Sequence, residues 1–325
     1  MDKIRVRLGI AAVATMFVVA ACAGPAATNA PTDGATQPTG SIRIDGSSTV
    51  GPLSEVAAQL YMEQNSRVRV SVAQSGTSGG FQKFCSGETD MNDASREIKD
   101  SEIEQCGQAG IGYDAIAVAN DALSLLVNND NPLSCLTVDQ ARQIWDLDST
   151  VATWGDVEGL DLPAEFAARP VSLFGPGTDS GTFDFFTEVI TGEVGRINLG
   201  YTDIGEDDHA AVLGVQGEEG AMGYVPYSYY REVLGDVKAL DIDDGNGCVA
   251  ATLENVQDGN YTPLGRPLFV YASDTSLARP EVLDFMKYYI DNAVQIAELA
   301  GFVPLTDEQL AEQHAKIEQL VGGGS

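Results

Sequence analysis

Three short segments rich in glycine and in hydroxyl side chains set the strongest limit on how this chain folds. They are Gly46–Val50, Ser75–Gly80 and Thr178–Thr182. Each follows a strand-like stretch (Ile42–Ile44, Val68–Ala73 and Val171–Phe174) and precedes apolar residues at helical spacing. Strands that alternate with helices in this way predict an α/β protein whose connections are mainly parallel.

The same three segments have the chemistry of an anion site. The start of a helix leaves backbone N–H groups without partners and carries a partial positive charge, so an oxyanion gains hydrogen bonds there. In open α/β sheets, the loops that lead from strands to helices converge beyond the carboxyl ends of the strands. We therefore expect the three segments to share one ligand site, although each taken alone is typical of an ordinary turn with a helix cap.

Further stretches continue the alternation along the chain. Strand patterns cover Ala115–Ala119 and Leu123–Val127, whereas helical patterns cover Val138–Trp145 and the long segment Glu281–Leu299. The last residues, 321–325, are predicted to form a disordered tail.

The charge of the chain excludes several classes of partner. Its net charge is −30, from 48 acidic and 18 basic residues, so neither nucleic acid nor an anionic lipid surface is attracted at long range. An anionic ligand is still compatible with this charge at contact range, because salt screens exposed charges beyond about 8 Å. A chain of 325 residues with 44% hydrophobic content is long enough for about two domains.

The N-terminal sequence indicates export. Basic residues precede an apolar run from Leu8 to Ala21, and Cys22 follows. This pattern predicts a signal peptide over residues 1–21, and Val19–Cys22 resembles a bacterial lipobox, which implies a lipid on Cys22. A plain signal peptide is the alternative. Residues 22–40 are predicted to be a flexible tether, so the protein is expected outside the cytoplasm and attached to the membrane only through its lipid.

The other four cysteines predict two disulfide bonds, because they are even in number in an exported chain. Three connectivities are available, and we favour Cys85–Cys106 with Cys135–Cys248. A zinc site is the rival interpretation, but the sequence holds no Cys-x-x-Cys motif and only two histidines. We predict neither a metal nor a cofactor.

Five motifs in this order resemble a known family. They are Asp45–Val50, Ser75–Phe81, Asp93–Glu97, Gly112–Val118 and Pro176–Phe183. The chain resembles the PstS-type phosphate-binding proteins of ABC transporters, in particular their SphX-like branch, from about residue 41 to about residue 320. The resemblance implies a monomeric binding protein that captures inorganic phosphate and delivers it to a permease.

The resemblance also implies a fold and a division into lobes. Members of the family have a two-lobed periplasmic-binding-protein fold of type II, with the ligand in the cleft between the lobes. Their chain crosses the hinge twice, which corresponds here to Val118–Leu123 and Val270–Asp274. The first lobe is thus expected to contain residues 41–120 and 271–320, and the second lobe residues 121–270.

The phosphate ligands that the resemblance implies come from all three segments. They are Ser48, Thr49 and Val50 in the first, Thr77 and Ser78 in the second, and Ser180, Gly181 and Thr182 in the third.

Two departures from the family pattern concern charged residues. Better-known members have an arginine where this chain has Pro176, and they have an aspartate where it has Arg96. Either Arg96 now supplies the cation, with Asp93, Asp114 or Asp179 as the acceptor of the phosphate proton, or the alignment shifts by a residue or more. The simpler interpretation is that Arg96 forms a surface ion pair and that the aspartates cap helices or form turns.

Other functions remain as alternatives. Sulfate, molybdate and tungstate are also tetrahedral oxyanions, and an adhesin or a sensor of the same fold is a third interpretation. A phosphatase or esterase needs an activated nucleophile or metals, and the sequence lacks the motifs that supply them. The two histidines, His209 and His314, lie away from the three segments.

Overall fold

The computed structural model describes residues 38–178, 180–205 and 207–322. The predicted signal peptide (1–21), Cys22, most of the tether and Asp179 therefore lie outside the described residues. Within the described part, no helix combines the length and the apolar character needed to cross a bilayer.

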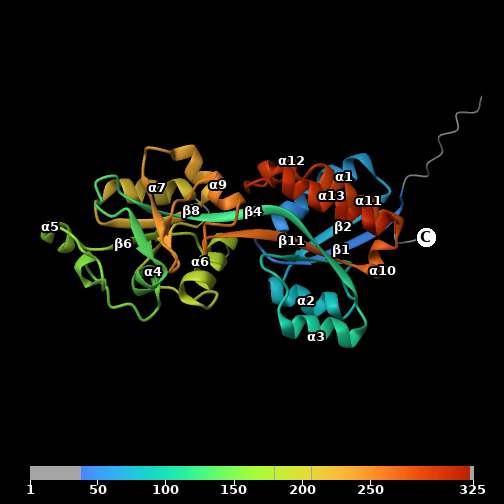
Figure 1. Ribbon diagram of the computed structural model, residues 1–325, viewed down its shortest axis with the longest axis horizontal. Helices are drawn as coiled ribbons and strands as arrows, with labels where there is room; N and C mark the ends of the chain where they lie inside the picture. Colours follow the sequence, from blue (N-terminus) through green and yellow to red (C-terminus); the bar gives the residue numbers. More distant parts are fainter. Residues whose placement is uncertain (1–37, 179, 206, 323–325) are drawn as a thin grey trace, which may run out of the picture. The chain divides into compact units, whose positions relative to one another are not determined.

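The described residues form two α/β lobes, which two long strands join (Figure 1). The joining strands are β4 (Tyr113–Val127) and β11 (Gly265–Ser273). The first lobe contains β1 (Gly40–Gly46), α1 (Gly51–Gln64), β2 (Val68–Gln74), α2 (Thr77–Cys85), β3 (Met91–Ala94), α3 (Asp100–Ala109), α10 (Asp274–Leu277), α11 (Pro280–Asp291), α12 (Ala293–Leu299) and α13 (Asp307–Gly322).

The second lobe is built from the segment between the two joining strands. It contains β5 (Cys135–Thr137), α4 (Val138–Trp145), η1 (Trp154–Asp156), α5 (Ala164–Ala167), β6 (Ser172–Gly175), α6 (Gly181–Thr191), β7 (Thr202–Asp203), α7 (Asp208–Gly217), β8 (Ala221–Pro226), α8 (Tyr227–Tyr230), η2 (Arg231–Val233), β9 (Lys238–Asp243), β10 (Cys248–Val249) and α9 (Leu253–Gln257).

One path of hydrogen-bonded strands runs through both lobes in the order β2-β1-β3-β11-β4-β8-β6-β7. The strands that lead into the three predicted loops lie in parallel pairs: β1 with β2 and β3, and β6 with β7 and β8. The joining strands β4 and β11 are antiparallel to each other, because they carry the chain between the lobes in opposite directions. The predicted α/β class is confirmed.

The strand β4 is continuous where the sequence pattern shows two separate stretches. Asn120 and Asp121, between these stretches, are polar but buried, at 3% and 7% exposure. Asn120 donates to Gln309 Oε1 at 3.1 Å, and Asp121 accepts hydrogen bonds from Arg266. Because distant segments form hydrogen bonds with both side chains, these buried polar residues do not interrupt the strand. The core of the first lobe includes β4 up to Ala119, and the core of the second lobe begins at Ala122.

The long helix predicted over Glu281–Leu299 is two helices, α11 and α12. The break falls at Asn292, whose side-chain Nδ2 donates to the carbonyl of Tyr288 at 2.7 Å and so competes with the helix for that acceptor. At the end of the described chain, α13 includes Val321 and Gly322, which the sequence pattern assigned to the tail.

The helix α6 is fixed by its apolar face on the core of the second lobe. Phe183, Phe185, Phe186 and Ile190 are all buried, and the ring of Phe186 stacks on Tyr224 with centroids 3.7 Å apart. Full burial of each such side chain stabilises the fold by about 1.5–3 kcal/mol. The start of α6 is therefore held rigidly at the edge of its lobe.

Both favoured disulfide bonds are confirmed. Cys85 at the end of α2 joins Cys106 in α3, and Cys135 in β5 joins Cys248 in β10, with Cα atoms 4.4 and 6.1 Å apart. The first bond anchors α2, the helix that follows the second predicted loop. The second bond ties together chain segments that are 113 residues apart.

Candidate functional site

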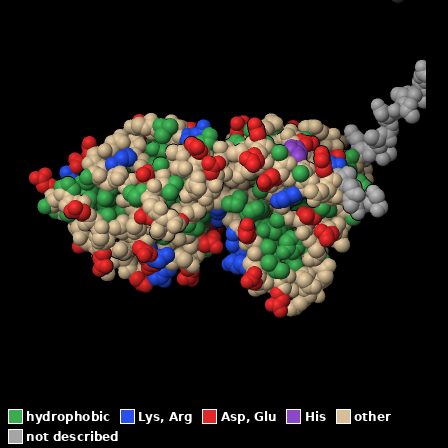
Figure 2. Space-filling view, in the orientation of Figure 1, with side chains coloured by type: hydrophobic (Ala, Val, Ile, Leu, Met, Phe, Trp, Pro, Cys, Tyr) green, Lys and Arg blue, Asp and Glu red, His purple; other side chains and the backbone are tan. Residues whose placement is uncertain are grey.

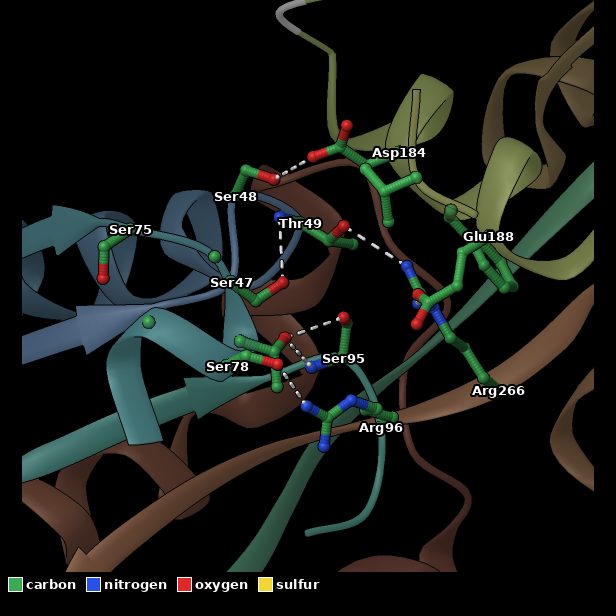
Figure 3. A pocket seen from close by; sticks show the side chains of 15 residues that line it. Ser47, Ser48, Thr49, Ser75, Ser78, Ser95, Arg96, Asp184, Glu188 and Arg266 are labelled. Atoms are coloured by element: carbon green, nitrogen blue, oxygen red, sulfur yellow. Dashed lines mark hydrogen bonds and ion pairs between the residues drawn. The ribbon is translucent and has the colours of Figure 1, made fainter. Parts of the chain in front are cut away.

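A cavity of about 230 Å³ lies between the lobes, where loops from both of them meet (Figure 3). The first lobe contributes the loop after β1, the start of α2 and the residues after β3, whereas the second lobe contributes the exposed face of α6. Figure 2 shows basic side chains at the groove between the lobes, while acidic side chains are spread over the rest of the visible surface.

The loop after β1 presents three consecutive hydroxyl groups, Ser47, Ser48 and Thr49, to the cavity. Ser47 Oγ accepts a hydrogen bond from the backbone N–H of Thr49 at 3.2 Å, which tightens the turn before α1. Val50, which follows, is the N-cap residue of α1, and its side chain is buried in the core of the first lobe. Val50 as a whole has no exposed surface and is not part of the cavity wall.

The second loop leads into α2 and is tied to the residues after β3. Thr77 and Ser78 occupy the first turn of α2 and line the cavity. Thr77 Oγ1 lies 3.1 Å from Ser95 Oγ and accepts a bond from the backbone N–H of Ser95. Gly76, the N-cap residue of α2, has φ 76°, a left-handed conformation that favours glycine.

Arg96 is the first cation of the site. Its two terminal nitrogens each donate to one oxygen of Glu102 at 2.8 Å, and Nη2 also donates to Ser78 Oγ at 2.8 Å. Burial raises the pKa of Glu102, but the bonds from Arg96 and from the backbone of Lys99 outweigh burial and hold that pKa below its usual range. Arg96 is thus both ion-paired and on the cavity wall.

Arg266 is the second cation, and the sequence analysis missed it. It comes from the start of β11, and its guanidinium group lies 3.4 Å from the centre of the Phe185 ring. Its nitrogens donate to Asp121 Oδ2 and to Thr49 Oγ1, all at 3.3 Å, so it links the second lobe to the first loop. Burial lowers the pKa of Arg266, an effect that the neighbouring carboxylates oppose.

Two carboxylates on α6, also missed, complete the wall. Asp184 Oδ2 accepts a hydrogen bond from Ser48 Oγ across the cleft at 3.2 Å, and Glu188 Oε2 lies 4.0 Å from Arg266 Nη1. Burial raises the pKa of Asp184 and the charge of Glu188 adds to this effect, whereas Ser48 and Arg266 act in the opposite direction.

The third predicted loop lies beside the cavity rather than on its wall. Ser180 is the N-cap residue of α6 and accepts a bond from the backbone N–H of Thr182 at 3.3 Å. Thr49 Oγ1 donates to the carbonyl of Gly181 at 3.3 Å, and a Cβ atom on Gly181 would lie 3.0 Å from the Cα of Thr49. The start of α6 and the first loop are therefore in direct contact, and a larger residue at position 181 would force the neighbouring backbone to shift by a few tenths of an ångström.

Two of the predicted proton acceptors, Asp93 and Asp114, lie elsewhere. Asp93 is fully buried in β3, where its Oδ1 accepts a bond from Ser54 Oγ, and it does not line the cavity. Asp114 lies near the start of β4, where burial and the charge of Asp274 raise its pKa. Among the described residues, no group of His, Cys, Asp and Glu side chains is arranged to hold a metal ion.

One signal in the sequence points to Arg266. It stands within Tyr261–Tyr271, a segment that also resembles the family's sequences although it is not among the five motifs named above. Asp184 and Glu188 carry no comparable signal, because two acids one turn apart on a helix usually face the solvent.

The chain is similar in sequence to known binding proteins. The model of a family described as "PBP superfamily domain" matches residues 30–293. The chain is 39% identical to Protein SphX of Synechococcus elongatus over 81% of its own length and 77% of the relative. It is 35% identical to the phosphate-binding protein PstS of Staphylococcus saprophyticus over 88% of its own length and 87% of the relative.

Solved structures agree with the sequence comparisons. The crystal structure of a possible phosphate binding protein from Planctomyces limnophilus is similar over 87% of this chain and 99% of that one, with a TM-score of 0.82 and 37% identity. An ABC-type phosphate transport receptor from Vibrio cholerae shares the fold, with a TM-score of 0.64 and 22% identity over 81% of this chain and 99% of that one.

Proposed function

We propose that this chain, which belongs to the PBP superfamily and within it to the relatives of PstS and SphX, captures inorganic phosphate outside the cytoplasm for an ABC permease. Its relatives carry the names of binding proteins and transport receptors. We therefore assign it the role of a receptor and not that of an enzyme.

The observation that carries this proposal is the convergence of two guanidinium groups and a set of hydroxyl groups on one cavity between the lobes. Arg96 comes from the first lobe and Arg266 from the joining strand β11, and each is fixed by a carboxylate behind it. Each hydrogen bond to a charged group is worth about 1.5–3 kcal/mol, so several of them exceed the cost of immobilising a small anion. A tetrahedral oxyanion presents acceptors in all the directions from which these donors come.

The proposed ligands combine the predicted residues with those that line the cavity. We propose that the hydroxyl groups of Ser48, Thr49, Thr77 and Ser78 and the guanidinium groups of Arg96 and Arg266 donate to the anion, together with backbone N–H groups of Val50, Gly181 and Thr182. The joining strands β4 and β11 form the hinge, because β4 has residues in the cores of both lobes and β11 leads from Leu264 of the second core into the first.

We also propose that a lipid attaches the protein to the membrane. The sequence up to Cys22 supports a lipid anchor, and the tether that follows gives the lobes reach toward the permease. We propose that the protein acts as a monomer, since an isolated receptor needs no symmetry.

Calorimetric titration of the chain without its first 21 residues tests the function. We expect phosphate to bind and Arg266→Gln to weaken this binding about 10- to 100-fold, because one or two charge-assisted bonds are lost. The exposed Arg69→Gln on β2 is the matched control and should bind as the wild type does, with melting curves to verify folding. Equal binding by Arg266→Gln, or tighter binding of sulfate, molybdate or tungstate than of phosphate, contradicts the proposal.

A further inference from the structure

The helix α3 has almost no apolar face with which to pack on the first lobe. Of its ten residues only Glu102 and Cys106 are buried, and Ile103, its one large apolar side chain, is 45% exposed. A helix of this length is marginal in water by itself, and most helices are held in place by an apolar face. Cys106 forms a disulfide bond with Cys85 at the end of α2. This bond is therefore the main attachment of the helix.

The same helix carries the carboxylate that fixes Arg96. Glu102 lies one turn before Cys106, and its two oxygens accept hydrogen bonds of 2.8 Å from the two terminal nitrogens of Arg96. The sulfur of Cys85 lies 3.6 Å from the backbone carbonyl oxygen of Glu102, so the disulfide contacts the residue that holds the cation. On the other side, Ser78 of α2 accepts a bond from Arg96 (Figure 3). The guanidinium group thus lies between the two helices that the disulfide joins.

The backbone at Arg96 is fixed separately from its side chain. Arg96 follows β3 closely, and two residues after it the N–H of Ile98 donates to Tyr271 Oη at 3.0 Å. The position of the residue is therefore set by the sheet, whereas the direction of its guanidinium group depends on Ser78 and Glu102. Hydrogen bonds weaken steeply when donor and acceptor are misaligned, so this direction affects the affinity for an anion more than it affects the fold.

We propose that the Cys85–Cys106 bond serves anion binding: through α3 and Glu102 it holds the guanidinium group of Arg96 in the direction in which it donates to the anion. This inference rests on the proposed function, in which Arg96 is a ligand. Glu102 is then a positioning residue, because it acts on the anion through Arg96 and not by contact.

The second disulfide bond offers a direct comparison. Cys135–Cys248 joins β5 to β10, and neither strand has a residue on the cavity wall. Its cysteines are 113 residues apart, whereas Cys85 and Cys106 are 21 apart, so its loss frees the unfolded chain more and lowers stability more. The two bonds should therefore rank in opposite order for stability and for phosphate affinity.

Two double variants, Cys85→Ala with Cys106→Ala and Cys135→Ala with Cys248→Ala, each remove one bond and leave no free thiol. Calorimetric titration uses the chain from residue 23 onward, which keeps all the described residues and lacks Cys22. Melting curves set a temperature at which the variants are folded. We expect the first variant to bind phosphate at least about tenfold more weakly than the wild type. The second is the matched control, and it should bind within about twofold of the wild type although it melts at the lower temperature.

A double-mutant cycle distinguishes an effect through Arg96 from a general loosening of the lobe. In a chain that carries Arg96→Gln, loss of the Cys85–Cys106 bond should change phosphate binding less than about twofold, because the group that the bond directs is absent. Glu102→Gln keeps both disulfide bonds and should weaken binding about tenfold, again only where Arg96 is present. Glu104→Gln, which changes an exposed acid of the same helix, is its control and should bind as the wild type does. The Glu102 variant keeps the test valid if the chain without the bond folds poorly.

Hydrogen exchange followed by mass spectrometry tests the attachment of α3 without any ligand. Peptides that cover α3 should exchange at least about tenfold faster once the Cys85–Cys106 bond is removed. Peptides that cover α1 and α6 should exchange as they do in the wild type, because the bond does not hold these helices.

The outcomes separate this inference from the proposed function. If the wild type binds phosphate, unchanged affinity in the folded chain without the Cys85–Cys106 bond, in Glu102→Gln or in Arg96→Gln overturns the inference and leaves phosphate capture standing. An equal loss of affinity with and without Arg96, or unchanged exchange in α3, overturns it as well. Absence of phosphate binding by the wild type overturns the proposed function and the inference with it.

Discussion

Asp93 is a buried carboxyl group that sets a distinctive pH dependence of stability. It lies in β3 with no exposed surface, and its Oδ1 accepts a 2.8 Å hydrogen bond from Ser54 while its Oδ2 has no partner among the described residues. Burial raises the pKa of Asp93 from 3.8 to about 8, and the charges of Asp45 and Glu55 add to this effect against the opposing bond from Ser54. At neutral pH the folded protein therefore keeps this group protonated.

Whether this carboxyl group makes the fold more or less stable as pH rises depends on which state, folded or unfolded, holds its proton. Above about pH 4 the unfolded chain releases the proton of Asp93, whereas the folded protein holds it up to about pH 8. Stability falls with rising pH wherever the folded state binds more protons. Between these two pKa values, Asp93 alone lowers the free energy of unfolding by about 1.4 kcal/mol per pH unit. The two values, 3.8 and about 8, are about 4 units apart, so the total loss of stability is on the order of 5 kcal/mol.

The variant Asp93→Asn isolates this contribution. Its amide resembles the protonated carboxyl group in shape and keeps an acceptor for Ser54, but it has no proton to lose. We expect the variant to match the wild type near pH 4 and to exceed its free energy of unfolding by several kcal/mol at pH 8. Urea unfolding followed by circular dichroism, at constant ionic strength from pH 4 to pH 8.5, measures the difference.

The control is Asp161→Asn, which changes an exposed aspartate before α5. Its stability should follow that of the wild type at every pH. Because groups distant from Asp93 titrate equally in wild type and variant, the difference between their curves reports Asp93 and the carboxylates coupled to it. Parallel curves for the wild type and Asp93→Asn across the whole range would refute the reasoning.

Three further predictions concern the cleft, the covalent links and the overall charge. Gly181→Ala places a methyl group 3.0 Å from Thr49 Cα, so calorimetry should show phosphate binding weakened at least about tenfold with little change in melting temperature. Breaking Cys135–Cys248 by Cys135→Ser should lower the free energy of unfolding by about 4–5 kcal/mol in urea titrations. Stopped-flow measurements should show phosphate association that speeds up with added salt, because salt screens repulsion by the net charge of −30.

The sequence predicts the local framework of the protein well. The helix pattern over Val138–Trp145 has the bounds of α4, and the three loops fall between the strands and helices expected there. These features depend on neighbouring residues, whose spacing is visible in the chain itself. The continuity of β4 through Asn120 is not visible, because the Gln309 that satisfies its side chain lies in a distant helix.

The site is predictable in its hydroxyl groups but not in its charges. Glycine and hydroxyl residues before a helix carry a local signature, so Ser48, Thr49, Thr77 and Ser78 could be named from the sequence, and all four line the cavity. Arg266 and the acids of α6 reach it only because the joining strands bring β11 and the second lobe against the first loop. Their role depends on contacts between residues far apart in the chain, such as the bond from Arg266 to Thr49.

An acidic protein holds an anion because long-range and short-range electrostatics act on different scales. The net charge of −30 is spread over a surface where salt screens it within about 8 Å. Inside the cleft, the side chain of Arg266 is only 12% exposed and is fixed by Asp121, so its donors keep their direction. Affinity is thus decided by donors already in place at contact range, whereas the surface charge acts on the rate of approach.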